Sequence, residues 1–157
     1  MKYTRLTKEQ LEELHPEFAN FLATQSIDKK EWDKIKIEQP HIAEQELDVF
    51  SDLIWEGVLT RAEYLENFSK SHGFLFQCGE THIHSIVLHV KDESVDLLSN
   101  EGMKFLAENM FTDAIEIRTG KKEYAQDRNP SIFALIQQGA FLSDGRFYNE
   151  LERIISG

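Results

Sequence analysis

The chain has 157 residues, 41% of them hydrophobic and 11 of them phenylalanine, so it can form one globular domain with a sizeable core and is too apolar to be disordered. Acidic residues outnumber basic ones 28 to 17, which gives a formal net charge of −11. A surface of this charge repels phosphate backbones and anionic lipid head groups, so we expect neither nucleic acid nor a membrane as a partner.

The sequence also predicts a setting for the protein. Its apolar runs are far shorter than the roughly 20 residues of a membrane span, and its start lacks the apolar core of a signal peptide. Cys78 is the only cysteine, so no internal disulfide requires an oxidising compartment. We therefore expect a cytoplasmic protein with a single domain over residues 1–157.

The first part of the chain carries clear helix signals. Thr7 and Gln10 have the spacing of a capping box and precede apolar residues at helical spacing. Pro16 lies on the opposite side of this predicted helix and should kink or split it, because proline removes one backbone hydrogen bond. Asp28 has the position of an N-cap for a second short helix.

Two more helices are predicted before the pattern changes. Pro40 suits the first position of a third helix, which we expect to break at Gly57. A fourth helix is predicted over residues 61–70, because Thr60 and Glu63 repeat the capping pattern. Four short helices with brief connections favour an antiparallel helical layer.

The second half changes from helical to strand periodicity. Residues 73–78 and 81–90 are rich in aromatic and β-branched residues and predict a hairpin around the segment "GET". A helix over residues 100–111 and a strand over residues 113–120 follow. The order strand, helix, strand suggests a right-handed crossover, with an antiparallel return as the alternative.

Two further helices complete the expected fold. Asn129, Pro130 and Gly139 have the positions of an N-cap, a first helical residue and a residue just past the helix end. The last helix is expected from about Gly145. The predicted fold class is α+β: a helical N-terminal half of about four short helices, packed with a small sheet of about three strands and three further helices.

Three segments of the sequence carry a family resemblance: "MKYTRLTKEQLEELHPEFANFLATQSI", "LDVFSDLIWEGVLTRAEYLENFSKSH" and "DRNPSIFALIQQGA". They resemble an uncharacterised family of small proteins from Bacteroidota, a domain of unknown function. The resemblance runs over most of the chain. It implies a bacterial cytosolic protein and carries no functional residue across.

The predicted hairpin contains a candidate metal site. His82 and His84 share one face of the second strand and could bind zinc or another transition metal if a third ligand joined them. Cys78 lies opposite His82 if the turn has three residues, and points to the other face if the turn has two. We favour the interpretation that these histidines are half-exposed and structural. A catalytic pair of Cys78 and His82 is disfavoured, because a reactive thiolate needs an electropositive setting and this protein is acidic.

The predicted third helix carries an acidic row: Glu44, Asp48, Asp52 and Glu56 recur every four residues. Like charges at this spacing oppose helix formation by about 0.2–0.5 kcal/mol per pair. Trp55 lies on the same side of the helix and could anchor a cationic protein partner that docks on the row. The alternative is an ordinary solvated helix face, which is the default for charged residues.

The sequence contains none of the common catalytic motifs, such as G-x-S-x-G, H-E-x-x-H or a phosphate-binding glycine loop. We therefore favour a non-catalytic protein-interaction or adaptor domain that uses its acidic surface or self-association and needs no cofactor. The alternative is a metal-binding protein or metal-dependent enzyme centred on His82 and His84. A third hypothesis, a small ligand bound between the sheet and the helices, requires a pocket there.

Overall fold

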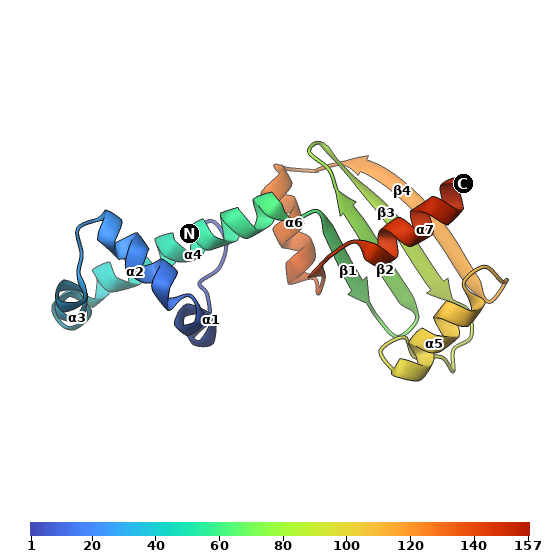
Figure 1. The fold of residues 1–157 in the computed structure, drawn as a ribbon, viewed down its shortest axis with the longest axis horizontal. Helices are drawn as coiled ribbons and strands as arrows, with labels where there is room; N and C mark the ends of the chain where they lie inside the picture. The colour runs from blue at the N-terminus through green and yellow to red at the C-terminus, as the bar shows by residue number, and fades with distance from the viewer. The chain divides into compact units, whose positions relative to one another are not determined.

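The structure is a computed structural model that describes all residues, 1–157, and contains seven helices and one five-stranded antiparallel sheet (Figure 1). It divides into two compact units, Met1–Thr60 and Arg61–Gly157. The single domain expected over residues 1–157 stays a prediction, because compact units can fold separately or together. None of the helices combines the length and the apolar character needed to cross a bilayer.

The first unit is helical. Its helices are α1 (Lys8–Glu13), α2 (His15–Thr24), α3 (Lys29–Glu38) and α4 (Pro40–Arg61), the last of which ends at the unit boundary. The Phe50 side chain of α4 is 1% exposed, and the rings of Phe18 and Phe21 on α2 lie 5.0 and 5.4 Å from its ring. This aromatic cluster holds α2 against α4.

Local capping signals predicted the starts of two of these helices correctly. Thr7 and Gln10 form the expected capping box at α1, and the Asp28 carboxylate accepts the Glu31 N–H at α3. The chain splits between α1 and α2, so that Pro16 lies in the first turn of α2, where its missing N–H costs nothing. The expected break at Gly57 is wrong, because α4 continues and buries Leu59 completely.

The second unit contains the sheet. The strands are β1 (Tyr64–Phe68), β2 (His72–Cys78), β3 (His82–Val90), β4 (Ile115–Glu123) and β5 (Phe141–Ser143), in the order β4-β3-β2-β1-β5, and all neighbouring pairs are antiparallel. The prediction of about three strands was therefore wrong, although the α+β class holds.

The two unexpected strands have different physical causes. β1 occupies the segment that was predicted as a fourth helix, because Leu65 is fully buried when it pairs with Phe76 of β2. Pairing with distant segments overrides a local capping pattern. β5 has only three residues, Phe141–Ser143, which is too short to show a periodicity.

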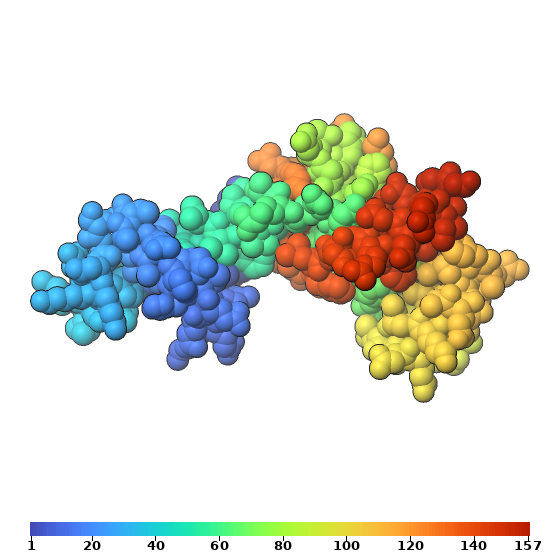
Figure 2. Space-filling model, in the orientation of Figure 1, coloured from blue at the N-terminus to red at the C-terminus, as the bar shows by residue number.

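Helices cover both faces of the sheet. We call the face that bears Leu75, Ile86 and Leu88 the core face, since these side chains are at most 2% exposed. The helices α5 (Asn100–Asn109) and α7 (Arg146–Ser156) pack on it and hide most of it in the space-filling view (Figure 2).

The opposite face bears Phe76, Ile83 and Ser85, and we call it the α6 face, because α6 (Arg128–Gln137) lies over part of it. β3 and β4 are antiparallel neighbours, so α5 joins them by the antiparallel return and not by a crossover. β4 is an edge strand of the sheet, and its residues 118–123 are exposed.

Candidate functional site

The acidic row on α4 binds the chain's own N-terminal residues. The Asp52 carboxylate accepts hydrogen bonds from the backbone N–H groups of Lys2 and Tyr3, at 2.7 and 2.8 Å. The Arg5 guanidinium donates to Asp48 Oδ1 at 2.7 Å. Two of the four carboxylates that were predicted to meet a cationic partner therefore already have intramolecular donors.

A third carboxylate of the row completes this arrangement. Glu56 accepts a hydrogen bond from the Tyr3 hydroxyl at 2.5 Å and lies 3.2 Å from Lys2 Nζ. Partial burial, together with this hydrogen bond, raises the pKa of Tyr3 above its ordinary value. Trp55, the predicted anchor, is half-buried on the same helix. We call residues 2–6 the N-terminal arm.

The end of the arm is fixed to α4 by burial. The Leu6 side chain is 7% exposed, and its N–H donates to Ser51 Oγ at 3.0 Å. The fully buried Ser51 hydroxyl donates in turn to the Leu47 carbonyl at 2.7 Å. The remaining acidic residue, Glu44, accepts a long hydrogen bond of 3.5 Å from Arg5 through its backbone carbonyl. The arm thus runs along the whole acidic row.

The β2–β3 hairpin separates the predicted metal ligands. Its register pairs Cys78 with Ile83, across a two-residue turn at Glu80–Thr81 that the Gly79 N–H closes on the His82 carbonyl at 2.9 Å. The sequence suggested a three-residue turn at Gly79–Thr81 or a two-residue turn at Gly79–Glu80, and the observed turn lies one residue further along than the second of these.

Partners in register share a face, so Cys78 lies on the α6 face and His82 and His84 lie on the core-face side. The structure therefore does not bring the thiol to the two imidazoles. No group of three or more His, Cys, Asp or Glu side chains is placed to hold a metal ion.

The surroundings of the Cys78 thiol make it an unreactive group. Its side chain is 7% exposed, and burial raises its pKa to about 11. Only the thiolate is a strong nucleophile or metal ligand, so the thiol is protonated and weakly reactive at neutral pH. His82 is half-buried, its Nδ1 is 2.8 Å from Thr81 Oγ1, and its Nε2 is 3.6 Å from Glu123.

Two other histidines meet at the opposite end of the same strands. His72 and His89 are paired in register, with ring centroids 4.4 Å apart and planes 10° apart. Parallel stacked rings direct their nitrogen lone pairs side by side and not toward one point. Sequence analysis missed the pair because only the observed turn places these two residues opposite each other.

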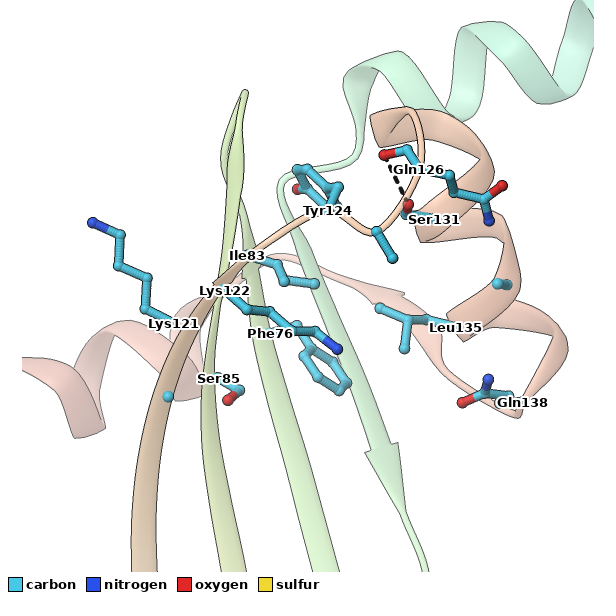
Figure 3. A pocket seen from close by; sticks show the side chains of 13 residues that line it. Phe76, Ile83, Ser85, Lys121, Lys122, Tyr124, Gln126, Ser131, Leu135 and Gln138 are labelled. Atoms are coloured by element: carbon cyan, nitrogen blue, oxygen red, sulfur yellow. Dashed lines mark hydrogen bonds between the residues drawn. The ribbon is translucent and has the colours of Figure 1, made fainter.

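A pocket of about 550 Å³ lies between the α6 face and α6 (Figure 3). The strands supply its floor, which includes Phe76 of β2 with Ile83 and Ser85 of β3. The connection from β4 to α6, residues 124–126, forms one wall. Its volume is within the range of about 300–1,000 Å³ that is typical of small-molecule sites.

The pocket results from a row of three paired residues whose side chains become smaller from β2 to β4. Phe76 pairs with Ser85, and Ser85 pairs with Gly120 of β4, so the three side chains shrink from a phenyl ring to a hydroxymethyl group to a hydrogen atom. A Cβ atom at Gly120 would lie 3.0 Å from Ser85 Oγ. The small side chains at the β4 end of the row leave open space beside α6.

One face of α6 closes the pocket. Ser131, Ala134, Leu135 and Gln138 are spaced by three or four residues and therefore line one side of the helix. Buried Ile132 and Phe133 lie on its other sides and fix the helix in place. The pocket thus has apolar groups at its centre and amide and hydroxyl groups at its rim.

A hydrogen-bond network holds the wall of the pocket. The Tyr124 hydroxyl donates to the Gly79 carbonyl at 2.8 Å, and the Arg128 guanidinium donates to the same oxygen at 3.0 Å. Arg128 also donates to the Ala62 carbonyl at 2.5 Å. Burial is the largest cause that raises the pKa of Tyr124, to about 12, so the phenol stays neutral. The pocket wall is therefore fixed in place before any ligand binds.

Two smaller grooves are also present. One of about 380 Å³ lies between α2 and α3 of the first unit and mixes Asp28 and Asp33 with lysines around Phe18 and Trp32. Another of about 330 Å³ lies between the sheet and α7 and includes His84. Its lining is more polar than that of the α6 pocket.

The comparisons with known proteins identify the family. An α+β protein with a pocket between its sheet and a helix is the class that fold and site define. The chain belongs to the family of unknown function DUF6495, whose model matches residues 1–156. This match confirms the predicted resemblance to a domain of unknown function. No curated protein and no solved structure matches the chain.

Proposed function

We propose that the protein is a non-catalytic binding protein that holds a small, largely apolar molecule in the α6 pocket. The observation that carries the proposal is the pocket itself, with Phe76, Ile83 and Leu135 around its interior and polar side chains at its rim. Apolar walls supply affinity by burying ligand surface, and a few polar groups set its orientation.

The lining supports binding and not catalysis. General acid–base chemistry usually draws on His, Glu or Asp, and nucleophilic chemistry on an activated Ser, Cys or Lys. No His, Asp or Glu lines the pocket, and the hydroxyl of Ser131 donates to the Gln126 carbonyl at 3.4 Å (Figure 3).

The protein-interaction hypothesis takes a narrower form. A cationic partner that docks on the acidic row must displace the N-terminal arm, which already donates to Asp48, Asp52 and Glu56. We therefore propose it only as a second function, in competition with the arm. As the setting we propose a bacterial cytoplasm, supported by the single cysteine and by the resemblance to Bacteroidota proteins.

Titration with the neutral fluorescent probe N-phenyl-1-naphthylamine tests the binding proposal. We expect saturable binding to the wild-type protein and a loss of at least about tenfold in affinity for Ala134→Phe, whose ring fills the pocket. Ala107→Phe, at an exposed position of α5, is the matched control and should bind as the wild type does.

A second variant keeps the test valid if Ala134→Phe does not fold. Gln138→Trp blocks the rim from an exposed position and leaves the interior unchanged. Absence of saturable binding by the wild-type protein would refute the proposal. Equal affinity in the wild type and in a folded rim-blocked variant would also refute it, by assigning the probe to another groove.

A further inference from the structure

The charges at the α6 pocket differ in sign from those of the whole protein. The chain carries 28 acidic and 17 basic residues, yet the pocket lining contains Lys121 and Lys122 and no Asp or Glu. Neither lysine forms an ion pair with a carboxylate. A site that holds a positive charge without a carboxylate partner, on an acidic protein, is complementary to an anion.

The register of β4 distinguishes the two lysines. Lys122 pairs with Ile83 and therefore lies on the α6 face, whereas Lys121 pairs with His84 on the other side of the sheet. Figure 3 shows the Lys122 side chain directed over the pocket toward α6 and the Lys121 side chain directed away from it. Only Lys122 can place its ammonium group beside a molecule in the pocket.

The polar groups near Lys122 suit a singly charged head group. The side-chain amides of Gln126 and Gln138 line the rim and form no hydrogen bond within the protein. One ammonium and two amide N–H donors match a carboxylate. A phosphate would favour bidentate guanidinium groups or several main-chain donors, which this pocket does not offer.

We infer that the ligand of the α6 pocket is an amphipathic monocarboxylate, whose apolar body lies between Phe76 and Leu135 and whose carboxylate binds Lys122. The inference rests on the proposed function and adds the charge of the ligand and the residue that recognises it. An ammonium group beside an apolar wall binds an anion more strongly than one in open solvent, because less water screens the pair.

A pair of isosteres tests the inference: 2-naphthoate and its neutral amide, 2-naphthamide, each titrated by calorimetry. We expect the wild-type protein to bind the carboxylate about fivefold more tightly than the amide, which is the upper end for an ion pair with a solvent-exposed lysine. Lys122→Met keeps the aliphatic stem and should remove this preference. Lys121→Met is the matched control and should keep it.

Each outcome bears on a stated claim. Equal binding of the two isosteres, or a preference that survives in folded Lys122→Met, would overturn the inference. If the neutral probe binds in the pocket while naphthoate does not, the inference is refuted and the proposed function stands. If neither the probe nor either isostere binds, the proposed function fails as well. A preference that Lys121→Met removes and Lys122→Met keeps would assign the anion to the wrong face and refute the inference.

Discussion

The acidic row of the first unit and the α6 pocket of the second unit each carry charge of one sign, but three of the four carboxylates in the row are paired with the N-terminal arm, whereas the lysine of the pocket is unpaired. Asp48, Asp52 and Glu56 hold the N-terminal arm through hydrogen bonds of 2.5–2.8 Å. Lys122 has no carboxylate partner. A charged cluster indicates a binding site only after the chain's own contacts with it are known.

The largest expected effect concerns the anchoring of the arm. Leu6→Ala should lower the free energy of unfolding of the first unit by about 3 kcal/mol, because it removes a buried side chain and leaves a cavity. Trp32 and Trp55 are the only tryptophans and both lie in this unit, so tryptophan fluorescence during urea unfolding measures the change. Leu53→Ala, 60% exposed, is the control; an equal effect there would show that the arm is not anchored as described.

The second prediction concerns Cys78, whose charge is suppressed by burial. Its pKa of about 11 lies above the ordinary value of 9.0, so the folded state holds its proton more tightly than the unfolded state does. Its contribution to stability is complete below pH 9 and is lost as pH rises to about 11, by about 2 kcal/mol in all. Unfolding measured from pH 8 to 11 should therefore show a shallower decline for Cys78→Ala, and identical slopes would contradict the burial effect.

The third prediction tests whether the acidic row stabilises the first unit through the arm. Asp52→Ala removes the acceptor of two backbone N–H groups and should cost about 1 kcal/mol, a value reduced for solvent exposure. Glu44→Ala is the control within the row, because its side chain forms no hydrogen bond. If both variants were as stable as the wild type or more stable, repulsion within the row would outweigh its hydrogen bonds to the arm. The contrast between a paired row and an unpaired pocket would then fail.

The smallest expected effect is the Arg5–Asp48 ion pair, whose side chains are 37% and 32% exposed. A double-mutant cycle with Arg5→Gln and Asp48→Asn should give a coupling energy of about 0.5 kcal/mol that shrinks at high salt. The same salt increase should weaken naphthoate binding at the pocket and leave naphthamide binding unchanged. A salt-independent coupling would indicate that packing, and not charge, joins the two side chains.

Local signals in the sequence predicted what depends on neighbouring residues. The caps at Thr7 and Asp28, the split near Pro16 and the β2–β3 hairpin all follow from residues within a few positions of one another. Strand β1 was missed because its hydrogen bonds and the burial of Leu65 come from β2 and β5.

The functional sites depended on distant contacts in the same way. The row on α4 was visible as a four-residue spacing, but its donors, Lys2, Tyr3 and Arg5, lie more than 40 positions away in the chain. The α6 pocket requires the register that sets Gly120 opposite Ser85. A one-residue shift of that register would move every side chain to the other face. The only sign of the pocket in the sequence was the pair of lysines in the segment "TGKKEY".

Lys122 lies on the open edge of the sheet and therefore also affects whether the protein aggregates. β4 ends in exposed residues with no strand on their outer side, and such edges readily accept another copy of the chain. Lysines on an edge strand oppose that pairing because stacked copies would bring like charges together. Neutralising Lys122 therefore weakens a safeguard against aggregation, and light scattering should show stronger self-association for Lys122→Met than for the wild type at equal concentration.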